Sequence, residues 1–385
     1  MKFFENRLKH AWYSVAFVFL LLGTIPGLLM RWGFLYGMPL PFGNMLHAHS
    51  HVLVLSWLNL MGVGLLCRLQ NVSLVRLRIF FWIQVVAGVA MFGGFLYQGY
   101  GALSIVASCL QMTGNFYITW VYFRKKYFQR DTFVSTALWF NLLSVIGIIG
   151  IAPAILLAGR DSNFFRLSVE FFLHFQIQGW LLTLWAGLIV RYLGIRLLRW
   201  QYILWTASVI LTFGISANYR FPNDSWLIIN GIGVVLQFIF TVLFFKKTYH
   251  LTSSWLIRIT LVSFLAKAVM PILTLTEPQA SWALSQRDIV LFYLHWVLIG
   301  IVMIGFLGIF QAKHRWFRWG IHLFMLGYFF TELILLAGGF PQWVPSSLLL
   351  AKYAWLAYSS TIMVSGIVIM TLDRLKLALT CKSDG

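Results

Sequence analysis

Long apolar runs follow one another along almost the whole chain, and this pattern limits the possible folds more than any other feature. A helix that crosses the hydrocarbon core of a bilayer needs about 20 apolar residues. Runs of this kind, bounded by charge, Pro or Gly, predict helices at 11–30, 46–67, 77–97, 101–123, 133–157, 167–190, 200–217, 226–245, 255–275, 288–311, 317–337 and 349–372. The sequence therefore predicts an all-α polytopic membrane protein, a twelve-helix transmembrane bundle.

The composition supports a lipid bilayer as the main partner. Hydrophobic residues make up 60% of the chain and charged residues 10%, yet the net charge is +19. A nucleic-acid partner would require a basic face on a soluble domain, and the short loops leave no room for one. We therefore expect no nucleic acid and a single transmembrane domain over residues 1–385, and no repeat of fixed period is apparent.

Lysine and arginine alternate between the two sides of the predicted helices. The predicted inner segments hold 21 of these residues, and the outer segments hold six: Arg31, Arg160, Arg166, Arg220, Arg287 and Lys352. Cytoplasmic loops are the ones enriched in positive charge. The pattern predicts a multi-pass protein of the cytoplasmic (inner) membrane with both termini cytoplasmic.

Histidine dominates the ionisable residues within the predicted helices. His47, His49 and His51 begin the second helix, His174 lies in the sixth and His295 in the tenth. All three helices enter from the outer side, so one histidine of each lies about two turns deep. His47 and His51 are four residues apart and share a face, whereas His49 points elsewhere. A lone intramembrane histidine is usually a strut between helices, but the matched depths favour a metal or haem iron.

With these histidines the chain resembles a divergent member of the haem-copper oxidase subunit I superfamily, which includes the nitric oxide reductases. In that family a histidine of helix two and one of helix ten clamp a low-spin haem. Leu46-His47 is similar to the helix-two motif, although His51 has the better depth, so either is a candidate. His295 stands five residues before Gly300, as does the helix-ten ligand in several branches.

The chain also departs from the family at the oxygen-reducing centre. Tyr293 occupies the position of the high-spin haem ligand, and His174 matches the copper histidine of helix six. However, the helix-seven segment 199–218 lacks the paired histidines of the copper site, and Gln176-Ile177-Gln178 replaces the Pro-Glu-Val-Tyr that follows that histidine in many oxidases. The resemblance implies a retained low-spin haem b and a lost or remodelled binuclear centre.

The leading hypothesis is therefore a membrane haem b protein for electron transfer. Its axial ligands would be His295 and one of His47 and His51, and its donor a quinol or a cytochrome. A link to nitric oxide stays open, an oxygen reductase is not expected, and whether the protein is an oxidoreductase enzyme is undecided.

Two alternatives remain. One is a metal transporter, sensor or assembly factor that binds zinc or copper without haem, because imidazole suits both metals. Its candidate ligands are His47, His49, His51 and His174 with Glu170. The other is a scaffold subunit without a cofactor.

Several other charged residues lie near these sites in the sequence. Glu170 stands one turn before His174, where it either orients the imidazole or pairs with Arg166. Lys267 and Glu332 are predicted to pair with each other or to serve a proton path. Solvated or lipid-headgroup contacts are expected for the histidines nearest the inner surface: His10, His250, His314 and His322.

Overall fold

The computed structural model describes residues 2–311 and 314–380, and every regular element within them is helical. Ten segments are long and apolar enough to cross a membrane: Arg7–Tyr36, Phe42–Leu69, Leu74–Gln98, Thr132–Ala158, Asn163–Tyr192, Arg199–Arg220, Asp224–Leu251, Trp255–Thr274, Arg287–Phe310 and Arg315–Gly339. They confirm the prediction of an all-α, multi-pass membrane protein.

Two further long helices lie where the remaining spans are predicted. These are α5 (Ala102–Arg124) and α18 (Lys352–Thr380), and neither is among the ten segments named above. Helix α5 buries polar side chains such as Gln111 and Asn115. The count of twelve therefore stays a prediction.

The described helices form two compact units. The first unit comprises the described parts of Met1–Phe128 and Gln311–Gly385, and the second unit is Gln129–Phe310. The single transmembrane domain over 1–385 stays a prediction.

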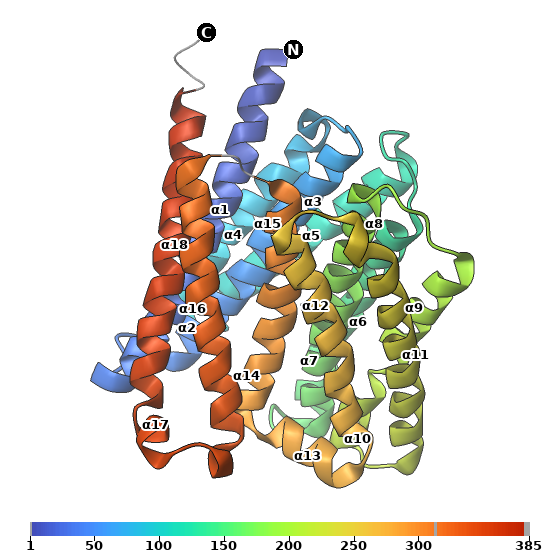
Figure 1. Ribbon diagram of the computed structural model, residues 1–385, viewed down its shortest axis with the longest axis vertical. Helices are drawn as coiled ribbons and strands as arrows, with labels where there is room; N and C mark the ends of the chain where they lie inside the picture. The colour runs from blue at the N-terminus through green and yellow to red at the C-terminus, as the bar shows by residue number, and fades with distance from the viewer. Residues whose placement is uncertain (1, 312–313, 381–385) are drawn as a thin grey trace. The chain divides into compact units, whose positions relative to one another are not determined.

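The first unit contains two groups of helices from opposite ends of the chain. The N-terminal group is α1 (Lys2–Tyr36), α2 (Phe42–His51), η1 (Val52–Trp57), α3 (Leu58–Leu69), η2 (Leu74–Leu77), α4 (Arg78–Gln98) and α5. The C-terminal group is α16 (Arg315–Gly339), η7 (Pro341–Trp343), α17 (Ser346–Leu350) and α18. The beginning of α1 and the end of α18 lie at the same end of this unit (Figure 1), which fits an even number of crossings.

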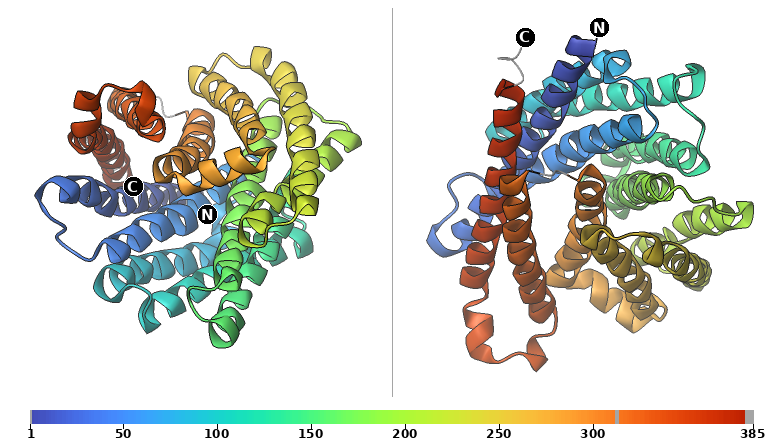
Figure 2. Two further views of the ribbon diagram at one scale, coloured as in Figure 1. Left: turned by 90° about the horizontal axis from the view of Figure 1, so that it is seen from below. Right: turned by 45° about the horizontal axis from the view of Figure 1, so that its top comes forward.

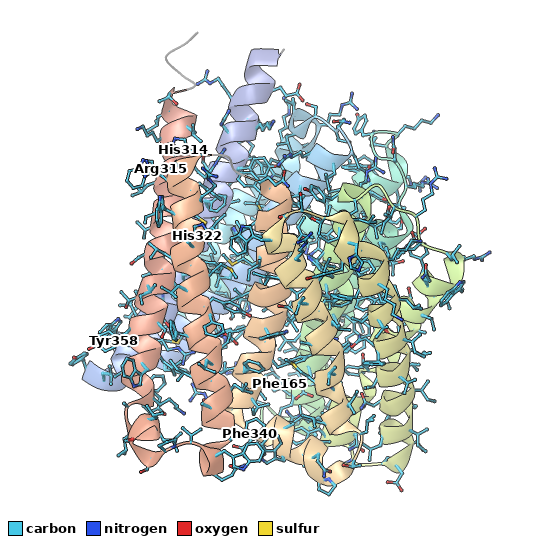
Figure 3. The ribbon with its side chains drawn as sticks, viewed as in Figure 1. Phe165, His314, Arg315, His322, Phe340 and Tyr358 are labelled. Carbon is cyan, nitrogen blue, oxygen red and sulfur yellow. The ribbon has the colours of Figure 1, made fainter. Side chains whose placement is uncertain are left out.

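Small residues bring α16 and α18 close together. A Cβ atom at Gly320 would lie 2.7 Å from the Gly366 carbonyl oxygen, and one at Gly327 would lie 2.5 Å from the Ser359 carbonyl oxygen. Helices associate closely in lipid where small residues line the contact. The two helices therefore run side by side, with His314 at the beginning of α16 and Phe340 just past its end (Figure 3).

The second unit follows the chain without interruption. Its elements are α6 (Thr132–Ala158), α7 (Asn163–His174), η3 (Phe175–Leu182), α8 (Thr183–Tyr192), α9 (Arg199–Leu211), α10 (Gly214–Arg220), α11 (Asp224–Thr248), η4 (Tyr249–Leu251), α12 (Trp255–Val269), η5 (Met270–Thr274), α13 (Glu277–Ser285), α14 (Arg287–His295), η6 (Trp296–Met303) and α15 (Ile304–Phe310). Helix α6 packs against α7, η3 and α8, whereas α11 packs against α9 and α12 (Figure 2).

Three elements of the described chain are π-helices, and each begins directly after a histidine. Element η1 follows His51, η3 follows His174 and η6 follows His295. A π-helical turn inside an α-helix is rare and frequent at functional sites. The three histidines singled out by depth thus occupy the same place in three separate helices.

The similarity of the three segments extends to a glycine thirteen residues after each histidine. Gly64, Gly187 and Gly308 each stand at this distance from their histidine. Each also lies against another helix of its own unit, since a Cβ atom there would be 2.8 Å from Trp12 Nε1, 2.9 Å from Phe133 Cβ and 2.9 Å from Ile257 Cγ1 respectively. The sequence therefore does contain a repeated segment, which inspection of the apolar pattern misses because few residue types are shared.

Candidate functional site

His51 is the best-oriented candidate ligand in the first unit. Its Nδ1 lies 3.0 Å from the His47 carbonyl oxygen, one turn earlier in α2. A carbonyl oxygen can only accept, so Nδ1 carries the proton and Nε2 presents a lone pair. Metal-binding histidines are commonly oriented by such a bond from the other ring nitrogen. The Nε2 atom of His51 is therefore suited to bind a metal.

Aromatic rings surround this imidazole. The Phe95 ring centroid lies 4.4 Å from that of His51, and the His47 centroid lies 4.4 Å from that of Tyr100. The Tyr100 hydroxyl lies 3.3 Å from His51 Nε2. Partial burial raises the pKa of the Tyr100 hydroxyl, so the phenol stays protonated and donates a long hydrogen bond. A metal at Nε2 would replace this bond.

Sequence reasoning misses Tyr100, although a signal for it exists. Gly99 and Gly101 flank this tyrosine in the short loop between α4 and α5, and Gly99 has a φ of 61°. A non-glycine residue rarely adopts this conformation. The turn between α4 and α5 thus brings a tyrosine flanked by two glycines against the histidines of α2.

The π-helix below His51 is held by side-chain amides. Asn59 Nδ2 and Gln111 Nε2 both donate to the Leu55 carbonyl oxygen, at 2.8 and 2.9 Å. All of these groups are buried. A carbonyl that π-helical geometry leaves available is satisfied in this way, and the segment carrying His51 is fixed to α5.

His49 connects α2 to α1. Its Nδ1 lies 2.8 Å from the Gly23 carbonyl oxygen, and a Cβ atom at Gly27 would lie 2.7 Å from the imidazole. The glycine face of α1 therefore makes room for the ring. The prediction that His49 points away from the His47/His51 face agrees with this contact, and its role here is a strut between helices.

His174 has the opposite arrangement from His51. Its Nε2 lies 2.7 Å from the Val209 carbonyl oxygen of α9, so Nε2 carries the proton. The remaining lone pair is on Nδ1, the nitrogen closer to the backbone. The outer nitrogen, which reaches a ligand most easily, is thus committed to a neighbouring helix.

Two residues that depart from the oxidase pattern contact each other. Gln178 Nε2 of η3 donates to the Tyr293 hydroxyl of α14 at 2.6 Å. Two residues further on, His295 ends α14, and Trp296 Nε1 donates to the Ser263 carbonyl oxygen at 2.9 Å. The segment around His295 is therefore anchored on both sides within the second unit.

Glu170 has a partner that the sequence does not suggest. Arg220 Nε donates to Glu170 Oε1 at 2.8 Å, and a second guanidinium nitrogen contacts the same oxygen. The pair joins α7 to α10 and is partly buried, with side-chain exposures of 16% for Arg220 and 25% for Glu170. Of the two predicted roles, pairing with an arginine is observed, but the arginine is Arg220 and not Arg166.

The other predicted charge contacts also have different outcomes. Lys267 donates to Gln237 of α11. His314, at the beginning of α16 (Figure 3), contacts the carboxylate of Asp373 of α18, whose side chain is 2% exposed. The His314 side chain is 46% exposed, as a solvated or headgroup position requires, and it has in addition a partner on the neighbouring helix.

The candidate metal ligands are distributed over both units. His47, His49 and His51 lie in the first, and His174 and Glu170 lie in the second. Within residues 2–311 and 314–380, no group of three or more His, Cys, Asp or Glu side chains is placed to hold a metal ion. The ring centroids of His47 and His51 are 5.9 Å apart.

No known protein family matches the chain, and no curated protein matches it in sequence. The resemblance to the haem-copper oxidases therefore depends on the histidines and on the helix count.

Proposed function

We propose that the protein is a membrane haem b protein in which His51 and His295 are the axial ligands and whose function is electron transfer. The observation that supports this most is the tautomer of His51, whose Nδ1 is held by a backbone carbonyl and whose Nε2 lone pair contacts only the hydroxyl of a loop tyrosine among the described residues. An axial histidine needs this tautomer. The position of His295, directly before a π-helix as His51 is, supports its choice as the second ligand.

We assign His51 and His295 to the same haem on two grounds. One is the family resemblance, and the other is their equivalent position in the repeated segment. Between His47 and His51, the carbonyl bond favours His51, because His47 supplies the acceptor that orients it. The haem would supply one-electron exchange, and the chain would supply two imidazoles, an aromatic surround and a dry interior. Bis-histidine coordination of this kind makes haem iron low-spin.

The same proposal covers twelve spans, cytoplasmic termini and an inner-membrane location. It is supported by the ten apolar segments together with α5 and α18, and by the excess of lysine and arginine in alternate loops. A quinol or a cytochrome is the proposed donor. With Gln178 bound to Tyr293 where the family carries haem and copper ligands, the proposed chemistry excludes oxygen reduction.

The test is the reduced-minus-oxidised spectrum of the purified full-length protein. We expect the sharp bands of a low-spin haem b, and we expect His295→Ala to remove them, because a dry bundle cannot replace the lost imidazole with water. His49→Ala is the matched control and should keep the bands, since His49 is bonded to α1. A colourless protein that contains zinc or copper would instead support the non-haem alternative.

A further inference from the structure

A lysine is buried in the second unit without an acid beside it. Lys267 is 1% exposed, and no Asp or Glu among the described residues lies within ion-pairing distance of its ammonium group. Its hydrogen-bond partner is Gln237 Oε1. An ammonium group has three N–H donors, so one neutral acceptor leaves most of its capacity unused.

Two polar residues on α11 have a buried group without a hydrogen-bond partner in the described part of the chain. Gln237 and Thr241 are four residues apart on one face and are 2% and 0% exposed. Within the described chain, Gln237 Nε2 and Thr241 Oγ1 are buried and make no hydrogen bond. Thr248 on the same helix behaves differently, since its hydroxyl donates to the Phe244 carbonyl oxygen at 2.7 Å. The Thr241 hydroxyl is thus left available.

The unused groups around Lys267 can all donate. Lys267 requires an acceptor and therefore fixes the Gln237 amide with Oε1 toward the ammonium, which leaves Nε2 as a free donor. The Thr241 hydroxyl can donate as well. Burying a charge without compensation is very costly, so the Lys267 amine stays protonated in this cluster only together with an acceptor that carries negative charge.

Buried polar groups without hydrogen-bond partners among the described residues also occur in the first unit, but they are of a different chemical kind. Among the described residues, Nε2 and Oε1 of Gln84, Oε1 of Gln111 and the Ser56 hydroxyl have no hydrogen-bond partner, and all three residues are 0% exposed. These groups include donors and acceptors and no charge, which is the environment that buried water satisfies. The unused groups named at Lys267 are donors apart from the Thr241 hydroxyl oxygen, and the amine adds a positive charge when it is protonated.

We propose that Lys267 Nζ, Gln237 Nε2 and Thr241 Oγ1 form a binding site for a small monovalent anion such as chloride. The anion would neutralise the ammonium charge and accept from both α11 donors. A buried site removes the hydration shell of its ligand, and the cost of this removal rises steeply with charge, so a halide fits better than a multivalent oxyanion. The site is independent of haem.

The experiment measures thermal unfolding of the full-length protein in detergent by tryptophan fluorescence. Sodium chloride and sodium bromide are compared with sodium gluconate, whose anion is too large, at equal ionic strength. A ligand that binds the native state raises the midpoint as its concentration rises. We expect chloride and bromide to raise the midpoint of the wild type above its value in gluconate, and Lys267→Met to weaken the halide effect about tenfold or more.

A second variant keeps the test decisive if Lys267→Met does not fold. Gln237→Glu places a carboxylate beside the ammonium and supplies the negative charge internally. We expect this variant to be as stable in gluconate as the wild type is in chloride, and to ignore the anion. Lys246→Met, at an exposed position near the end of α11, is the matched control and should keep the wild-type halide response.

Either of two results would overturn the proposal. One is a wild-type midpoint that is the same in chloride, bromide and gluconate, which would mean that water satisfies the donors. The other is a halide response that persists in Gln237→Glu or in Lys267→Met, which would place the responsible ion elsewhere.

Discussion

The segments that begin at His51 and at His174 occupy the same place in the repeated pattern, yet their imidazoles have opposite hydrogen bonds. His51 bonds through Nδ1 to a carbonyl of its own helix and keeps Nε2 available. His174 bonds through Nε2 to a carbonyl of α9. Each histidine thus has the same position relative to its π-helix. Whether Nε2 is available for a ligand depends instead on the hydrogen-bond acceptors that the neighbouring helices provide.

The surroundings of the two rings differ in the same sense. His51 lies among the rings of His47, Phe95 and Tyr100 and contacts a hydroxyl in a loop. His174 lies against Phe175 and Phe213 and is joined to a backbone atom. A loop hydroxyl can move away when a ligand arrives, but the carbonyl of a packed helix cannot.

Loss of haem is the largest effect that this comparison predicts. His51→Ala should abolish the low-spin spectrum, because it removes the proposed axial nitrogen, whereas His174→Ala should keep it. The measurement is the reduced-minus-oxidised spectrum per mole of purified protein. If His174→Ala were colourless and His51→Ala fully coloured, the assignment of ligand and strut would be reversed.

The next effect concerns the stability of the fold, and here we expect the larger change at His174. His174→Ala removes a buried ring and leaves the Val209 carbonyl with only a long bond from Thr212, at 3.3 Å, so it should lower the free energy of unfolding by about 2 kcal/mol. Denaturant unfolding in detergent measures this value. His250→Ala changes an exposed side chain and should stay within about 0.5 kcal/mol of the wild type. An equally stable His174→Ala variant would show that the strut contributes nothing.

Removing the Tyr100 hydroxyl tests the availability of His51 Nε2, and we expect a smaller effect on haem binding. Tyr100→Phe keeps the ring against His47 but frees His51 Nε2 from its hydrogen bond. A net hydrogen bond contributes about 1 kcal/mol, so haem should bind about fivefold more tightly. Titration of the haem-free protein with haem b measures this change. Weaker binding would mean that the hydroxyl supports the cofactor rather than competing with it.

The sequence predicts the coarse fold well because lipid imposes a simple rule. Every backbone polar group within a bilayer must be satisfied internally, so apolar length alone locates ten of the described spans. The resemblance of α5 to a span is weaker, since buried polar residues such as Gln111 and Asn115 lower its hydropathy.

The candidate site is predictable only in part. Depth singles out His51, His174 and His295, and helical periodicity separates His49 from the shared face of His47 and His51. Depth and periodicity cannot predict the hydrogen bonds between helices, because these bonds depend on which helices pack together and which of their side chains meet. Arg220 beside Glu170, and Gln237 beside Lys267, are fifty and thirty residues away from their partners in the chain.

The smallest predicted effect is at Asp131, which helps to hold the helix that packs against η3. Its Oδ1 accepts from the backbone N–H groups of Phe133 and Val134, at 2.9 and 3.2 Å, and so caps α6. Burial raises the pKa of the Asp131 carboxyl, although these two N–H groups and Arg191 act to lower it. The folded protein therefore holds this proton more tightly than the unfolded chain does.

The sign of the pH dependence follows from this difference in pKa. Below the unfolded-state pKa the carboxyl is protonated in both states, and the favourable contribution is fully present. As the pH rises through the folded-state pKa, the unfolded chain has already lost its proton and this contribution disappears. Asp131→Asn keeps a capping oxygen without the titration, so its stability should stay within about 0.5 kcal/mol of the wild type and lack this decline across the acidic range. Unfolding midpoints measured over that range test the prediction, and the haem spectrum should not change, because Asp131 supports η3 and not the segment of His51. An identical decline in Asp131→Asn would assign the titration to another carboxyl group.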